Sequence, residues 1–185
     1  MIRSPAFLRG RSTRRFPFHA LLLLLFAAVG AHAQTCLPPV GGDWTAWLNR
    51  QEAAGGHTLA CHVNVSVNGL IGRIENRGGN QSGVCLQTGT ASSWSGPQSL
   101  ISVITPIIQA NAQAIATGPA GDSVYTGRAD DTIGTSVTAF EGKDRGKNRN
   151  ACPKNDSYVC ATTRTWRAIV RKTATDCFLL TAFPT

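Results

Sequence analysis

The chain has 185 residues, with 18 Lys and Arg against 10 Asp and Glu, and it contains six cysteines. Five of the basic residues and none of the acidic ones lie before residue 34, so the remaining 152 residues carry 13 basic and 10 acidic side chains. A mildly positive chain of this length suits one domain that can bind a polyanion without being obliged to, and the lack of any later run of roughly 20 apolar residues excludes a transmembrane domain.

The first 33 residues have the layout of a secretory signal peptide. Five arginines form a positive leader, an apolar run extends from Ala20 to Val29, and the small-residue site Ala31-His32-Ala33 follows. We expect cleavage after Ala33 and a secreted or periplasmic mature domain over 34–185, with no membrane attachment after cleavage. A retained N-terminal anchor is the alternative.

All six cysteines follow the predicted cleavage site, at positions 36, 61, 85, 152, 160 and 177. An even number of cysteines in an exported chain indicates a disulfide framework, whose connectivity the sequence leaves open. A zinc site is not expected, because no pair has the two-residue spacing of a zinc knuckle. Cys152 and Cys160 bracket a polar loop and are the predicted local disulfide.

The first part of the mature chain is predicted to be helical, because apolar residues recur at helical spacing between capping residues and glycines. A long helix is predicted from Pro97 to Gly118, and Pro106 should bend or interrupt it because proline lacks the amide donor. The residues 79–83 form a glycine-rich loop before a short extended piece around 84–86. The three earlier helices are predicted to begin after Asp43, near His57-Thr58, and at Ser66 or Asn68, and the first and third to end at Gly55-Gly56 and Gly78.

Beyond Pro119 apolar and polar residues alternate, which is typical of strands. In the segment 158–171, Trp166 falls on one face and Arg167 and Arg171 on the other, and Trp94 and Trp166 are expected in the core. Helices followed by strands predict an α+β fold rather than alternating β-α units. Strands are predicted over 123–126, 132–140, 158–171 and 177–183, with a charged loop over 141–153.

Two histidines remain in the mature chain, His57 and His62. On one helix, residues five apart subtend about 500°, so the two rings would point roughly 140° apart. They would converge on one atom only if the helix starts after His57. Taken alone, each is more typical of a capped or partly buried structural histidine than of a catalytic one, so this spacing does not select a catalytic base.

Several short motifs occur in a characteristic order along the mature chain. They are GGHTLACHV at 55–63, Leu70 with Arg73, ASSW at 91–94, TIGTSV at 132–137 and LTAFP at 180–184. In this order they resemble the RNase A-like toxin domain at the C-terminus of bacterial contact-dependent inhibition (CdiA) proteins. The resemblance implies an RNase A-like α+β fold in which N-terminal helices pack on a curved antiparallel β-sheet.

Carried over residue by residue, the resemblance makes His62 the catalytic histidine, Arg73 its cationic partner and Thr181 a third catalytic residue. A neutral imidazole can take the proton of a ribose 2′-hydroxyl, and a guanidinium can hold the charge that builds on the phosphate oxygens. A threonine hydroxyl can bond the phosphate or a base edge. No metal or other cofactor is expected, because the substrate carries its own nucleophile, and the resemblance implies a 2′,3′-cyclic phosphate product.

The family's terminal tyrosine is Phe183 in this chain, which keeps a ring for stacking on a base but loses the hydroxyl. Three explanations stay open: reduced activity, a substitute group from His57 or Tyr158, or a domain that binds without cutting. Thr181 and Phe183 should face one side of the last strand, together with Cys177 and Leu179. The remaining candidates for substrate binding are His57, Arg167 and Arg171.

Basic residues crowd the segments 143–154 and 164–172. They either form a track for phosphates or keep a solvated loop and strand edge from aggregating, and the sequence does not decide between these roles.

The resulting hypothesis is a secreted, monomeric, metal-free endoribonuclease that acts as an antibacterial toxin or a degradative enzyme. Its partners would be RNA and, for a toxin, a cognate immunity protein. The first alternative is a catalytically weakened or inactive module that binds RNA or a partner protein, and the second is a purely structural envelope protein.

Overall fold

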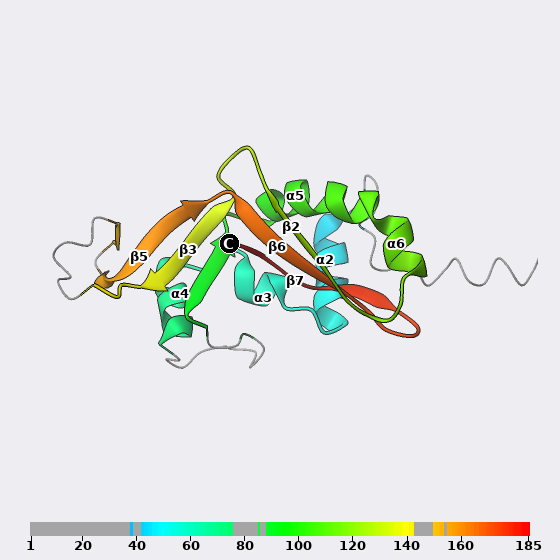
Figure 1. Ribbon diagram of the computed structural model, residues 1–185, viewed down its shortest axis with the longest axis horizontal. Coiled ribbons are helices and arrows are strands. Elements are labelled where there is room, and N and C mark those ends of the chain that lie inside the picture. Colours follow the sequence, from blue (N-terminus) through cyan, green and yellow to red (C-terminus); the bar gives the residue numbers. More distant parts are fainter. Residues whose placement is uncertain (1–37, 39–41, 76–84, 86–87, 143–149, 154) are drawn as a thin grey trace, which may run out of the picture. The chain divides into compact units, whose positions relative to one another are not determined.

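The computed structural model describes residues 38, 42–75, 85, 88–142, 150–153 and 155–185 (Figure 1). All of these belong to the second of two units, His32–Thr185. The predicted signal peptide, the glycine-rich loop at 79–83, Gly78 and most of the extended piece and charged loop lie outside the described residues. Within the described ranges, no helix is long and apolar enough to cross a membrane.

The described elements confirm the predicted α+β class, with most helices preceding most strands (Figure 1). In chain order they are α2 (Trp44–Ala53), α3 (Thr58–His62), α4 (Val67–Ile74), β1 (Thr90–Trp94), α5 (Pro97–Ala110), α6 (Ala112–Thr117), β2 (Gly121–Arg128), β3 (Gly134–Ala139), β4 (Ala151–Cys152), β5 (Asn155–Thr163), β6 (Thr165–Lys172) and β7 (Cys177–Pro184).

The predicted helix starts are confirmed by their capping bonds. Asp43 Oδ1 accepts a hydrogen bond from the Ala46 amide at 3.0 Å and so caps α2. Of the two candidates for α4, Ser66 is the cap, since its Oγ accepts from the Gly69 amide at 3.2 Å. Helix α3 starts at Thr58, one residue after His57.

Of the two effects predicted for Pro106, a bend or an interruption, the interruption does not occur, because α5 continues through Pro106 and the helix breaks at Asn111 instead. Pro106 and Ser102 are both exposed, so water can serve the Ser102 carbonyl that proline leaves without an amide donor. At Asn111 the side-chain amide donates to the Ile107 carbonyl at 2.8 Å, which competes with continuation of the helix.

The strands form two antiparallel sheets where the sequence predicted a single curved one: β1-β3-β5-β4 and β2-β6-β7. The strand predicted over 158–171 is two strands, β5 and β6, which belong to different sheets and meet at Arg164. The Ala129 amide donates to the Arg164 carbonyl at 2.8 Å. Thr163 and Thr165 both donate their hydroxyls to the Thr185 carbonyl. These hydrogen bonds to residues far along the chain stabilise the passage from β5 to β6. The alternation of polar and apolar residues does not predict them.

The strand β1 was not predicted, because its residues 91–94 are all buried and so show no alternation of polar and apolar side chains. It pairs with β3 along its whole length and brings Ser92 and Ser93 into the interior. The two-residue strand β4 was also missed.

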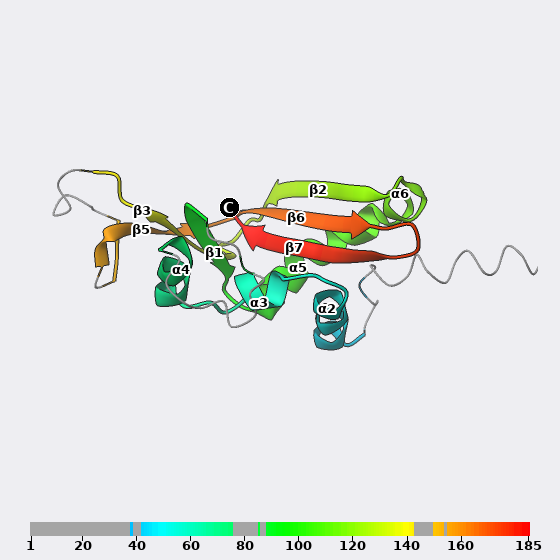
Figure 2. The ribbon, with the colours of Figure 1, turned by 90° about the horizontal axis from the view of Figure 1, so that it is seen from below.

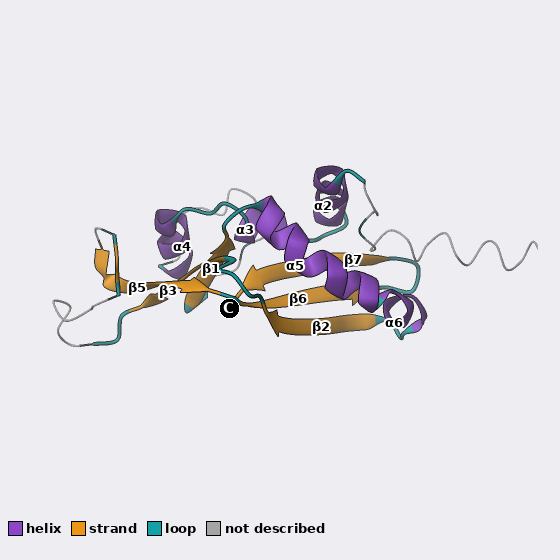
Figure 3. Ribbon diagram, turned by 90° about the horizontal axis from the view of Figure 1, so that it is seen from above, coloured by secondary structure: helices purple, strands orange, loops and turns teal. Residues whose placement is uncertain are grey.

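Helix α5 lies across one face of the β2-β6-β7 sheet (Figure 3). Trp166, Ala168 and Val170 of β6 are buried on this face, whereas Arg167 and Arg171 are exposed on the other, as the alternation predicts. Trp94 is buried in the same core, which confirms the prediction for both tryptophans. A second core joins α4 to the other sheet, through Leu70, Ile71, Ala91, Val137, Cys152 and Tyr158. The β2-β6-β7 sheet therefore has one face that α5 does not cover.

Candidate active site

Helix α3 carries His62, with His57 as its cap residue, and is attached to the outer edge of β7 (Figure 2). The His57 amide donates to the Leu180 carbonyl at 2.9 Å. The Ala182 amide donates to Thr58 Oγ1, also at 2.9 Å. These two bonds flank Thr181, so the segment from the first histidine to the second is held beside the end of the last strand.

A β-bulge at Leu180 sets which side chains of β7 face the uncovered side of the sheet. Thr181 pairs with Ile169, but Leu179 pairs with the next residue, Val170. Directly opposite residues share a face, and consecutive residues alternate, so Thr181 and Leu179 lie on opposite faces. The prediction that Leu179 and Cys177 share the face of Thr181 is therefore wrong. Cys177 and Leu179 are both buried in the core, and the bulge turns Thr181 away from it.

Phe183, Thr181 and Arg167 share the uncovered face, since Phe183 is directly opposite Arg167 and two residues from Thr181. Thr181 is buried, and its Oγ1 has no hydrogen-bond partner among the described residues. Arg167 is exposed. The predicted pairing of Thr181 with Phe183 on one face is confirmed.

His62 is buried against Phe183, with the two rings stacked at a centroid distance of 5.1 Å. Its Nδ1 lies 3.0 Å from the carbonyl oxygen of Ser92 in β1. Because a carbonyl can only accept, Nδ1 carries the hydrogen of the neutral ring, and the lone pair remains on Nε2. Burial lowers the pKa of His62 to about 4, with smaller contributions in the same direction from Arg73 and His57 and an opposing one from the bond to Ser92. The ring is therefore a neutral proton acceptor at pH 7.

The ring of His57 lies 6.3 Å from that of His62, centroid to centroid. The two converge because the helix starts after His57, so that the 140° rotation expected on one continuous helix does not apply. Burial lowers the pKa of His57; Glu52 acts against this shift, and the positive charges of Arg73 and Arg171 add to it.

Arg73 comes from the last turn of α4 and points back to α3, where its Nη1 donates to the Cys61 carbonyl at 2.7 Å. The Nε is buried and has no partner among the residues that the structure describes. Desolvation lowers the pKa of Arg73, and its charge acts on both histidines. A guanidinium stays protonated in proteins, so the site holds a fixed positive charge next to a neutral imidazole.

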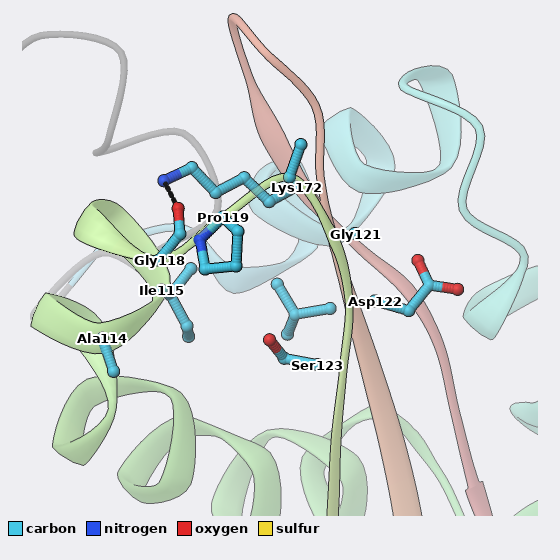
Figure 4. A pocket seen from close by; sticks show the side chains of 10 residues that line it. Ala114, Ile115, Gly118, Pro119, Gly121, Asp122, Ser123 and Lys172 are labelled. Carbon is cyan, nitrogen blue, oxygen red and sulfur yellow. Dashed lines mark hydrogen bonds between the residues drawn. The ribbon is translucent and has the colours of Figure 1, made fainter.

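Two basic residues of the predicted phosphate track have partners within the fold. Arg171 forms a bidentate ion pair with Asp122 on the neighbouring strand, with N–O distances of 2.7 and 2.8 Å. Lys172 donates to the Ala116 and Gly118 carbonyls at 2.6 and 2.5 Å and so caps the end of α6. It lines a cavity of about 150 Å³ there, apart from the histidines (Figure 4). The residues 143–149 and Lys154 lie outside the described residues.

Tyr158 is poorly placed to replace the missing tyrosine hydroxyl. It is buried in the second core, under α4, and its hydroxyl donates to Glu75 Oε1 at 2.5 Å. Of the two substitutes considered from the sequence, only His57 lies beside His62.

The predicted Cys152–Cys160 disulfide is confirmed, and a second disulfide joins Cys61 to Cys85. Cys177 is disulfide-bonded as well. The Cys61–Cys85 bridge is next to the site, because Cys61 precedes His62 and its carbonyl holds Arg73.

Sequence reasoning missed two residues that shape the site. Ser92 orients His62, and its segment had been recognised only as part of a motif. Glu52 caps α3, accepting from the Leu59 and Ala60 amides at 2.9 and 3.3 Å. Its position, six residues before Thr58 and across a glycine turn, falls outside the usual spacing of a capping box.

The burial of His62 predicts a loss of stability in acid. Its pKa is about 4 in the folded protein against 6.5 for a free histidine. Between these values the unfolded chain binds more protons, so the free energy of unfolding falls as pH falls, by about 3 kcal/mol for the whole shift. Urea unfolding from pH 7 to 4 should show this slope in the wild type and a shallower one in His62→Gln. Equal slopes would contradict the assignment.

Within the described ranges, no group of three or more His, Cys, Asp or Glu side chains is arranged to hold a metal ion.

No family model and no curated protein matches the sequence. Among solved structures, the chain is similar to the CdiA-CT/CdiI complex from Y. kristensenii 33638, with 18% identity and a TM-score of 0.44 over 67% of this chain and 94% of that one.

Proposed function

We propose that the protein is an exported endoribonuclease that cleaves RNA without a metal and acts as an antibacterial toxin. The observation that supports this most is the buried, neutral His62, with its lone pair on Nε2, beside the fixed charge of Arg73. Attack of a 2′-hydroxyl on a phosphodiester requires a base for the hydroxyl proton and, near it, a cation for the charge on the phosphate oxygens.

In the proposed reaction, His62 Nε2 takes the proton of the 2′-hydroxyl as that oxygen attacks the adjacent phosphorus. Negative charge grows on the non-bridging oxygens, and Arg73 stabilises it with donors that include the buried Nε, for which the described part of the chain offers no partner. The Thr181 hydroxyl, which has no partner among the described residues, supplies a further hydrogen bond. Phe183 presents its ring edge-on or face-on to a base, and Arg167 next to it attracts the backbone.

The competing proposal is a module that binds RNA or a partner protein without cutting it. Phe183 favours it, because the phenyl ring has no proton to give. For a toxin, a neutralising immunity protein would fit this site with acidic groups, since the fixed charge there is positive.

The test compares an RNA oligonucleotide with a 2′-O-methyl oligonucleotide of the same sequence, in excess EDTA. The protein is expressed with its leader and purified in its secreted, oxidised form. We expect the RNA to be cut to products with 2′,3′-cyclic phosphate ends and the methylated strand to stay intact but to compete for binding. Cleavage of both strands would contradict 2′-hydroxyl attack, and binding without cleavage of either would favour the second proposal.

A further inference from the structure

The proposed reaction lacks one component. When the bond from phosphorus to the 5′-oxygen breaks, the departing alkoxide needs a proton, and an acid placed beside it accelerates this step. His62 is occupied as the base, Phe183 has no hydroxyl, and the hydroxyl of Tyr158 is bound to Glu75 in the other core.

We propose that His57 is the general acid that protonates the leaving 5′-oxygen, which places both proton-transfer groups at the start and end of α3. This inference rests on the proposed function and deepens it.

The separation of the two rings suits these roles. In an in-line displacement the attacking and leaving oxygens stand on opposite sides of the phosphorus, so base and acid must flank the phosphate rather than touch each other. The centroids of His57 and His62 are 6.3 Å apart and the ring planes are inclined by 44°. At this separation one phosphodiester can contact both rings, with the attacking oxygen at His62 and the leaving oxygen at His57.

The position of His57 is fixed independently of any substrate. Its amide is bonded to the Leu180 carbonyl, and its carbonyl accepts from the Cys61 amide at 3.1 Å as the first bond of α3. The side chain is part-exposed, whereas His62 is buried, so the proposed acid can exchange its proton with solvent and the proposed base is shielded.

Four charged or titratable groups from three helices and a strand act on His57. Burial lowers the pKa of His57, Arg73 of α4 and Arg171 of β6 add to this shift, and Glu52 of α2 opposes it. His62 of α3 is the aromatic neighbour of the ring. Both carboxylate oxygens of Glu52 are held by amides of α3, which keeps this negative charge at the start of the helix. A bound phosphodiester adds a second negative charge, which acts in the same direction as Glu52 and raises the pKa of His57 against the effect of burial. Glu52 is thus a positioning residue that supports the acid.

The 2′-oxygen loses its proton to His62 Nε2 and forms the new bond to phosphorus. The electron pair of the bond from phosphorus to the 5′-oxygen goes to that oxygen, which takes a proton from His57. His62 ends protonated and His57 neutral; both return to their starting states by proton exchange with solvent, which reaches His62 once the product has left, so no oxidant, reductant or co-reactant is required.

The test uses two substrates that differ only in the leaving group: a dinucleotide, which releases a 5′-alkoxide, and the matching nucleoside 3′-(4-nitrophenyl phosphate), which releases a phenolate that needs no proton. We expect His57→Ala to lower kcat/KM by about 10² to 10⁴ on the dinucleotide and by less than about tenfold on the nitrophenyl ester. His62→Ala, the matched control, removes the base and should impair both substrates.

A second variant addresses a structural role for His57. Glu52→Gln keeps a side-chain oxygen that can cap α3 but removes the charge that favours protonated His57. The basic limb of its kcat/KM profile should move to lower pH, with the same melting temperature as the wild type.

Equal losses of His57→Ala on both substrates, or an unmoved basic limb in Glu52→Gln, would overturn the assignment of His57 and leave the proposed function standing. If the wild type cleaves neither substrate, the proposed function itself fails.

Discussion

Replacing His62 with glutamine is expected to lower kcat/KM for RNA cleavage by about 10² to 10⁴, the usual effect of removing an acid-base group. Glutamine is of similar length and can donate to the Ser92 carbonyl that His62 Nδ1 now contacts at 3.0 Å. The substitution therefore removes the lone pair on Nε2 while keeping a hydrogen bond in the interior. Initial rates on a labelled oligonucleotide measure the effect.

The fold of His62→Gln provides the control. Because the buried imidazole resists protonation, its removal should leave stability at pH 7 nearly unchanged and make the protein more tolerant of acid. A folded variant that retains more than about a tenth of the wild-type activity, against the usual cost of losing an acid-base group, would show that His62 is not the base. The site would then have to be built around His57.

Removing the Cys61–Cys85 disulfide should destabilise the protein by about 3 kcal/mol and also impair the site. The bridge closes a loop of 24 residues, and loop-closure entropy in the unfolded chain gives an effect of about this size. The Cys61 carbonyl also orients Arg73, and the following residue is His62. Urea unfolding and RNA cleavage of the Cys61→Ser, Cys85→Ser protein measure both effects.

The Cys152–Cys160 bridge provides the matched control, since it closes a loop of only 8 residues and belongs to the core under α4. Its double serine variant should lose somewhat less stability, about 2 to 3 kcal/mol, and keep its activity. Equal activity losses in the two variants at matched folded fractions would contradict a specific link between Cys61 and the site.

The sequence predicted correctly those features that depend on residues close together in the chain. Asp43 and Ser66 cap their helices through side chains that reach amides three residues on, and such bonds are visible in sequence as spacing. The alternation of Trp166 and Arg167 predicted which face of β6 is buried, because a strand with one covered face repeats every two residues. Cys152 and Cys160 are near enough in the chain for their pairing to be expected.

The arrangement of the site required contacts between residues far apart in the chain. The alternation of polar and apolar residues does not indicate that the chain changes sheets at Arg164. It also does not indicate that an extra residue at Leu180 turns Thr181 away from the core. The ion pair of Arg171 with Asp122 likewise depends on a side chain 49 residues away, which the sequence pattern does not indicate.

The sequence was sufficient to predict which chemical groups form the site: one imidazole as the base, a second imidazole nearby, a guanidinium, and a phenyl ring in place of a phenol. Their number and spacing left open whether those groups meet. The two imidazoles meet because α3 begins one residue after His57 and is bonded to the edge of β7. This arrangement places the centroids of the two rings 6.3 Å apart. Hydrogen bonds between backbone groups of distant segments determine such distances, and side-chain identity alone does not encode them.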